Sequence, residues 1–135
     1  MERIRILVAN HSPAMCRAVK NVLSRLDCVT VDTVGDGKEA LAMLYAIEYG
    51  LLITSWSLTG MCGTELTRTI RSDKHLCHTP VLMITERHQR SDITRAAKCG
   101  VSGLLINPFR QEKLIQTVES LLAGNKETGD SKSVA

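Results

Sequence analysis

Short apolar runs alternate with stretches of helical periodicity along this chain, and residues that break regular structure separate them. The runs are rich in branched aliphatic side chains and too short for helices, which favours strands buried on both faces of a sheet. We expect strands over residues 4–9, 28–34, 51–55, 80–85 and 103–106.

Between these runs, apolar residues recur every three or four positions, the spacing of one helix face. Ser12 and Pro13 supply an N-cap residue followed by a proline in the first helical turn. Gly100 follows the fourth helix, where a C-terminal glycine is expected. The pattern predicts helices over residues 13–26, 40–47, 64–71, 89–98 and 111–122.

Five strands alternating with five helices predict an α/β fold with a five-stranded parallel sheet and helices on both faces. In such sheets the functional crevice lies beyond the carboxyl ends of the strands. The residues at those ends are Asn10, His11, Ser55, Trp56, Thr85, Glu86 and Asn107. We expect one domain over residues 1–123 and a flexible polar tail over residues 124–135.

Composition narrows the class of protein. Of 135 residues, 44% are hydrophobic and 23% charged, which is typical of a globular chain. The first residues run directly into a strand, and no apolar run approaches the roughly 20 residues of a membrane helix. We therefore expect a cytoplasmic protein without membrane contact. The five scattered cysteines predict reduced thiols, and a net charge of +3 does not favour nucleic acid.

Several segments carry a family resemblance. They are ILVANHSPAMCRAVKNVL, VGDGKEAL, LLITSWSLTGMCGTEL, HTPVLMIT and GVSGLLINPF. Over residues 3–123 the chain resembles a stand-alone, chemotaxis-type receiver domain of two-component response regulators. The resemblance implies a flavodoxin-like (βα)5 fold and a cis Asn107–Pro108 bond.

The resemblance also implies a degenerate phosphorylation pocket. The family's phosphorylatable aspartate falls on Ser55, its acidic pair on Asn10 and His11, and its lysine on Asn107, while Thr85 matches the family residue. Three carboxylates and one ammonium group are thus replaced by neutral side chains. Mg²⁺ prefers oxygen ligands that include a carboxylate, and serine is a weak nucleophile without a base. We expect neither aspartyl phosphorylation nor a cofactor, Mg²⁺ included.

Other chemistry is less well supported by the residues. His11 and Ser55 are neighbours in the expected fold, but no carboxylate orients the imidazole, so we do not expect an enzyme. His11 could instead sense pH. The segment His75, Cys77 and His78 lacks the second ligand pair of a structural zinc site.

The sequence therefore predicts a pseudo-receiver that acts by phosphorylation-independent protein–protein interaction, with its polar pocket residues hydrogen-bonded to one another. The resemblance places the partner-binding face on Arg90, Arg95, Leu104, Ile106 and Arg110. Expected partners are a histidine kinase, another receiver or a motility or output protein, and a homodimer is possible. The alternatives are a small-ligand or pH sensor and a phosphorelay receiver with an unexpected acceptor.

Overall fold

The computed structural model describes residues 3–124. Strands and helices alternate strictly along them, as the sequence predicts. The strands are β1 (Ile4–Ala9), β2 (Val29–Val34), β3 (Leu51–Ser55), β4 (Val81–Thr85) and β5 (Gly103–Ile106). The helices are α1 (Pro13–Leu23), α2 (Gly37–Ala46), α3 (Gly63–Ser72), α4 (Arg90–Cys99) and α5 (Gln111–Leu122). Apart from Gly124, the predicted tail of residues 124–135 lies outside the described residues.

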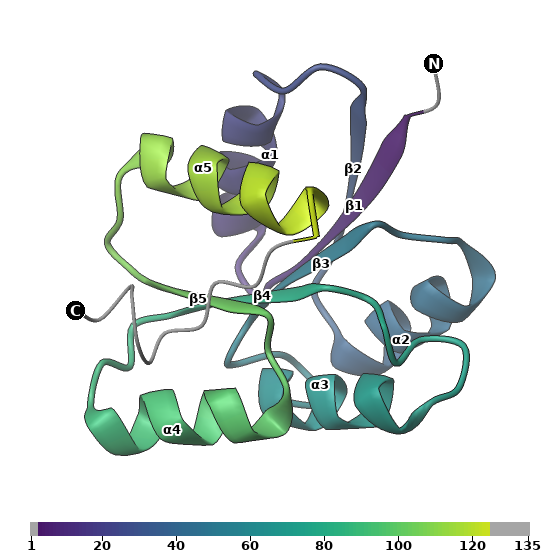
Figure 1. The fold of residues 1–135 in the computed structure, drawn as a ribbon, viewed down its shortest axis with the longest axis vertical. Helices are drawn as coiled ribbons and strands as arrows, with labels where there is room; N and C mark the ends of the chain where they lie inside the picture. The colour runs from purple at the N-terminus through teal and green to yellow at the C-terminus, as the bar shows by residue number, and fades with distance from the viewer. Residues whose placement is uncertain (1–2, 125–135) are drawn as a thin grey trace.

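All five strands pair in parallel in the order β2-β1-β3-β4-β5. Helices α1 and α5 cover one face of this sheet, and α2, α3 and α4 cover the other (Figure 1). The predicted α/β class with helices on both faces is confirmed. Because the chain order reverses around β1, the ends of β1 and β3 flank a topological switch point, where ligands bind in such sheets.

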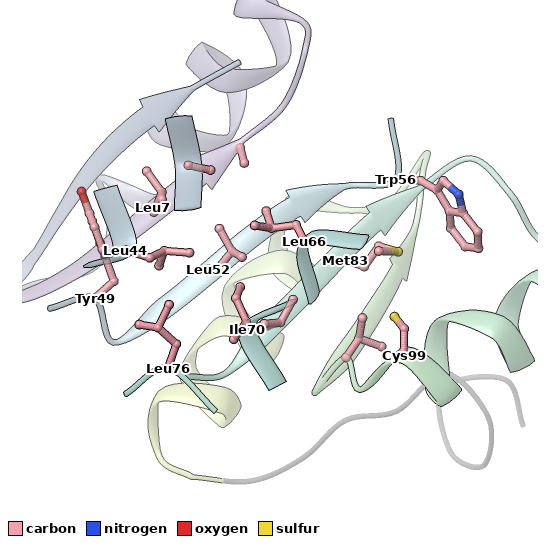
Figure 2. Packing of buried hydrophobic residues seen from close by; sticks show 14 of the residues in the cluster. Leu7, Leu44, Tyr49, Leu52, Trp56, Leu66, Ile70, Leu76, Met83 and Cys99 are labelled. Carbon is pink, nitrogen blue, oxygen red and sulfur yellow. The ribbon is translucent and has the colours of Figure 1, made fainter. Parts of the chain in front are cut away.

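Each layer of helices closes its own aliphatic core. The core beneath α1 and α5 contains Ile6, Leu23, Ile53 and Val118 among others. The core beneath α2, α3 and α4 extends from Tyr49 at one end to Trp56 at the other (Figure 2). Because both faces of the sheet are covered, β3 and β4 are buried at every position.

The element boundaries differ from the prediction by a few residues, with local causes. Helix α1 stops at Leu23 rather than at residue 26, because the chain tightens there into three-residue bonds such as Leu26 N–H to Leu23 O. Cys28 has a φ of 66° and precedes β2 instead of joining it. Pro80 lacks an N–H and stays outside β4, although its carbonyl accepts from Leu52 N–H at 3.0 Å.

Three predicted local features are confirmed. The Ser12 hydroxyl caps α1 by accepting from Met15 N–H, and Gly100 ends α4 in the left-handed conformation with a φ of 104°. The Asn107–Pro108 bond is cis. Helix α2 starts earlier than predicted because the Asp36 carboxylate caps it, accepting from Lys38 and Glu39 N–H. No helix within residues 3–124 is long and apolar enough to cross a membrane.

Candidate functional site

A pocket of about 410 Å³ opens at the carboxyl ends of β1, β3 and β4, where the strand order predicts a crevice. The structure brings all five predicted pocket residues together there. Its lining is Asn10, His11, Ser12, Met15, Ser55, Trp56, Ser57, Ile84, Thr85, Glu86, Arg87 and Asn107. Glu86 and Arg87 are the two formally charged residues of this lining, and both are exposed.

The buried polar side chains of this pocket are satisfied by their own loops. Asn10 Oδ1 accepts from Ser12 N–H at 2.9 Å, and Thr85 Oγ1 accepts from Arg87 N–H at 3.0 Å. The Ser55 hydroxyl donates to the carbonyl of Ser57 at 2.5 Å. Each bond spans two residues, so each side chain stabilises the turn that leaves its own strand.

These bonds correct one prediction. We expected the pocket side chains to hydrogen-bond one another, but within residues 3–124 each of Asn10, Ser55 and Thr85 bonds a backbone group in its own turn. The physical reason is reach: a serine, threonine or asparagine side chain meets a backbone group two residues away more readily than a neighbouring strand. No buried side-chain nitrogen or oxygen of the described chain lacks a hydrogen-bond partner.

Two side chains of the pocket contact the same backbone carbonyl, that of Ser57. Besides the Ser55 hydroxyl, it contacts the His11 ring through Nδ1 at 3.2 Å. Because a carbonyl only accepts, this contact is a hydrogen bond when Nδ1 carries the proton. His11 and Ser55 therefore face the same third group, and no described hydrogen bond joins them as a base and nucleophile would require.

A close backbone approach fixes the loop that carries Ser57. Gly63 N–H, at the start of α3, donates to the carbonyl of Trp56 at 2.7 Å. A Cβ atom at Gly63 would overlap the Ser55 carbonyl oxygen, far inside contact distance. Glycine at this position thus allows α3 to pack directly against the end of β3.

Trp56 joins the pocket to helix α4. The side chain is 7% exposed and belongs to the core beneath α2, α3 and α4, as Figure 2 shows. The guanidinium carbons of Arg87 and Arg95 lie 4.5 and 5.6 Å from its ring centroid, within cation–π range. Arg87 also lies 3.6 Å from a carboxylate oxygen of Asp92. The predicted position of Trp56 beside the pocket is confirmed.

The predicted partner-binding face needs one correction. Arg90, Arg95 and Arg110 are exposed and Ile106 is partly exposed. Leu104 is only 6% exposed and lies in the core, since β5 is covered by helices on both sides. The Leu104 side chain therefore packs inside the domain and adds almost no area to this face.

Cys16, in the first turn of α1, is a buried thiol beside the pocket residue Asn10. Burial raises the pKa of the Cys16 thiol, which donates to the carbonyl of Asn10, so this thiol stays protonated near neutral pH. Within residues 3–124, no group of three or more His, Cys, Asp and Glu side chains is placed to hold a metal ion, the segment around His75 and His78 included.

Sequence reasoning missed Ser57 and the double contact of Trp56. The group of Ser57 that forms the contacts is its backbone carbonyl. Every residue has this group, so the residue type does not indicate its role. The arginines on Trp56 come from different segments, the β4–α4 loop and α4. The available signal was the Ser-Trp-Ser segment at the end of β3, which places two serines beside the single tryptophan of the chain.

Comparisons with known proteins agree with this geometry. Residues 6–119 match the family described as response regulator receiver domain. The chain is 36% identical over 118 residues to the chemotaxis protein CheY of Pseudomonas aeruginosa, covering 87% of this chain and 95% of that protein. It is 35% identical over 120 residues to CheY-3 of Vibrio cholerae, covering 89% and 92%.

Solved structures show the same fold. The structure of CheY4 of Vibrio cholerae matches with a TM-score of 0.81 and 25% identity over 88% of this chain and 98% of that one. The receiver domain of RcsB from Salmonella enterica, solved with a phosphomimetic, matches with a TM-score of 0.85 at 17% identity, covering 98% of each chain. With its flavodoxin-like fold and its site at the strand ends, this chain belongs to the response regulator receiver domain family of two-component signalling.

Proposed function

We propose that this chain is a receiver module that signals without phosphorylation of its own strand-end pocket, by displaying one surface to a partner protein. The observation that carries the proposal is the Ser57 carbonyl with its two neighbours, Ser55 and His11. At the position where the family carries its acceptor aspartate, a neutral hydroxyl donates a hydrogen bond into its own loop. This hydroxyl is therefore occupied inside the protein rather than poised as a nucleophile.

The oxygen atoms of the pocket do not suit the Mg²⁺ ion that the family uses. Mg²⁺ demands near-octahedral oxygen ligands and keeps at least one carboxylate in most protein sites. Here Asn10 Oδ1 accepts from Ser12 N–H, and the Ser57 carbonyl accepts from the Ser55 hydroxyl. The exposed Glu86 is the one carboxylate in the lining, and Arg87 beside it offsets its charge.

Intact-mass spectrometry tests the phosphorylation half of the proposal. Wild-type protein incubated with Mg²⁺ and acetyl phosphate should keep its mass. A variant that restores the family chemistry, with Asn10→Asp, His11→Asp, Ser55→Asp and Asn107→Lys, is the positive control and should gain one phosphoryl group. A phosphoryl group on the wild-type chain would overturn the proposal and favour the predicted alternative of an unexpected acceptor.

The surface of the partner interaction is the exposed face of α4, β5 and the start of α5, with Arg90, Arg95, Ile106 and Arg110. The relatives named chemotaxis proteins suggest a histidine kinase, another receiver or a motility protein as partner, and we place the interaction in the cytoplasm. Capture from native extract without a phosphodonor should recover such a partner with wild type and lose it with Ile106→Glu plus Arg110→Glu. Retention of every partner by this variant would remove β5 and α5 from the interface.

The ligand-sensor and pH-sensor alternatives predicted from the sequence would both use this pocket. Wild-type protein can be used to test the pH-sensor alternative. A pH sensor built on His11 requires chemical shifts at Ser55 and Ser57 that change with pH, because the His11 ring and the Ser55 hydroxyl both contact the Ser57 carbonyl. Chemical-shift profiles that stay flat between pH 5.5 and 8 would exclude pH sensing and support the display role.

A further inference from the structure

We propose that the cleft between α1 and the start of α5 binds a small apolar carboxylate, such as a short fatty acid. The cleft has a volume of about 480 Å³, which falls in the range of small-molecule sites. Met15 and Asn107 line both this cleft and the strand-end pocket, so the two cavities adjoin. Ligand binding in the cleft requires neither a partner protein nor the display function proposed above.

The floor of the cleft is apolar and recessed. Val19 and Val22 of α1 and Leu114 of α5 line it and are buried, while Met15 and Phe109 are partly buried. These two helices cover the same face of the sheet (Figure 1). Contact with a hydrocarbon chain would remove water from this floor, which is favourable. A globular partner needs a broad surface of about 800 Å² on each side, whereas a recessed floor between two helices suits a small molecule.

Arg25, just beyond the end of α1, is the one charged residue among the described residues that line the cleft. Its Nη2 donates to Oε1 of Gln111 at 2.7 Å, a bond that joins the end of α1 to the start of α5 across 86 residues. The neutral amide holds the guanidinium group without cancelling its charge. Within residues 3–124 no carboxylate lies at ion-pair distance from Arg25. The N–H groups that Gln111 leaves free can donate to a carboxylate, the anion whose geometry the guanidinium fork matches.

Asn107 makes the junction between the cleft and the strand-end pocket electrically neutral. Its backbone N–H donates to the carbonyl of Thr85 at 2.8 Å, and its side chain, which lines both cavities, carries no charge. A carboxylate in the cleft therefore meets a cation at Arg25 and none at this junction. We expect the hydrocarbon part of the ligand, rather than its carboxylate, to lie toward Met15 and Asn107.

The combination of one cation with an apolar floor distinguishes between classes of ligand. A single cation favours a ligand with one negative charge, whereas a nucleotide carries several charges on its phosphates. A sugar would bury hydroxyl groups against Val19 and Val22 without hydrogen-bond partners, which is unfavourable. An amine would bring a second positive charge next to Arg25. A short fatty acid meets both requirements, because its chain covers the floor and its carboxylate pairs with Arg25.

Octanoate is the probe, titrated into the full chain and followed by calorimetry and by amide chemical shifts. A ligand of this size should bind with a Kd in the millimolar range or below. Arg25→Gln should weaken octanoate binding about fivefold but leave the binding of octanamide, a neutral probe of the same length, within about twofold of wild type. The matched control is Arg17→Gln, which removes the same charge from an exposed position of α1 outside the cleft. It should leave the binding of both probes unchanged.

A second pair of variants tests the apolar floor. Ala18→Phe adds a ring at an exposed position that lines the cleft, and it should abolish the binding of both probes. Ala14→Phe makes the same change at an exposed position of α1 that does not line the cleft, and it should leave binding unchanged.

An absence of saturable binding at millimolar octanoate would overturn the proposal, as would equal weakening by Arg25→Gln and Arg17→Gln. Octanoate-induced shifts centred on Ser55 and Thr85, rather than on Val22 and Leu114, would place the ligand in the strand-end pocket and overturn it too. A native protein that is captured by wild type, lost with Ala18→Phe and not displaced by octanoate would assign the cleft to a protein partner instead. None of these results depends on whether the chain is phosphorylated, so they are distinct from failure of the display function.

Discussion

Polar side chains at the two ends of the sheet differ in the range of their hydrogen bonds along the chain. At the amino ends of β4 and β5, the Arg71 guanidinium reaches the carbonyls of Cys77, Thr79 and Gly100 and the hydroxyl of Ser102, at 2.6 to 3.2 Å. These bonds span 6, 8, 29 and 31 residues, so one side chain ties together the end of α3 and two loops.

At the carboxyl ends the bonds are local. Those of Asn10, Ser55 and Thr85 each span two residues, and the contact of His11 with Ser57 is the long-range one. A group that bonds within its own turn can change without unlinking distant parts of the chain. The contrast supplies a physical reason why the pocket chemistry proposed above would leave the fold intact.

The largest expected effect on stability comes from removing the Arg71 hydrogen bonds at the amino end of the sheet. Arg71→Met should lower the free energy of unfolding by about 3 kcal/mol, because it removes four hydrogen bonds from a partly buried cation and leaves several carbonyls unpaired. Chemical denaturation measures this loss. Arg68→Met, one turn earlier on the exposed side of α3, is the control and should change stability little. Similar losses for both would contradict the linking role of Arg71.

At the carboxyl end of the sheet, Gly63 is a position where two backbone segments approach closely. Gly63→Ala would bring a methyl group against the Ser55 carbonyl, so we expect a loss of about 2 kcal/mol through overpacking and displacement of α3. Urea denaturation of this variant and of Gly35→Ala, where an added Cβ would lie 3.6 Å from the Asn10 carbonyl oxygen, an ordinary contact, separates close contact from a general effect of removing glycine. Equal stability of Gly63→Ala and wild type would contradict the close approach.

At the amino end of β3, Tyr49 gives the stability a pH dependence. Burial, and then a hydrogen bond to Asp32, raise the pKa of Tyr49 to about 12, whereas the unfolded chain should have the ordinary value of 10. The folded state thus keeps its proton when the unfolded state loses it, so this contribution is complete below pH 10. It decreases by about 2 kcal/mol as pH rises to 12.

Tyr49→Phe lacks this contribution. The difference in unfolding free energy between wild type and variant, measured by denaturation from pH 9 to pH 12, should therefore shrink steadily above pH 10. A difference that stays constant across this interval would show that the tyrosine titrates normally and that its bond to Asp32 adds no protection.

The smallest expected effect is at the pocket itself. Ser55→Ala removes one local hydrogen bond and should cost about 1 kcal/mol or less, since the Ser57 carbonyl retains the His11 contact. Thermal unfolding measures this loss of stability, and Ser72→Ala, at an exposed position of α3, is the variant for comparison. A loss as large as that of Arg71→Met would mean that Ser55 links distant segments, and the contrast between the two ends would fail.

The sequence predicts the strands, helices and strand-end residues because periodicity and capping residues are properties of residue type. It predicts the lining of the pocket because all parallel strands end at one edge. It does not predict the hydrogen bonds there, since backbone groups such as the Ser57 carbonyl are invisible in residue identity. The burial of Leu104 was missed for a related reason: the resemblance placed the residue on a surface, whereas helices cover β5 on both faces.

The role of Arg71 was also beyond sequence reasoning. An arginine in the last turn of a helix is usually solvated or interacts with the helix dipole. Its four partners come from loops that only the folded sheet brings together.

On the proposed function, the strand-end pocket is a neutral structure whose polar side chains are hydrogen-bonded within the protein. The most direct measurement is a Trp56 fluorescence titration with Mg²⁺ followed by beryllofluoride, since Trp56 lines the pocket and is the single tryptophan of the chain. Wild type should give a flat response, while the restored variant with Asn10→Asp, His11→Asp, Ser55→Asp and Asn107→Lys should respond saturably. A saturable wild-type response to Mg²⁺, or to beryllofluoride in its presence, would show that the pocket still binds the ion and the phosphoryl mimic, and would contradict the proposed function.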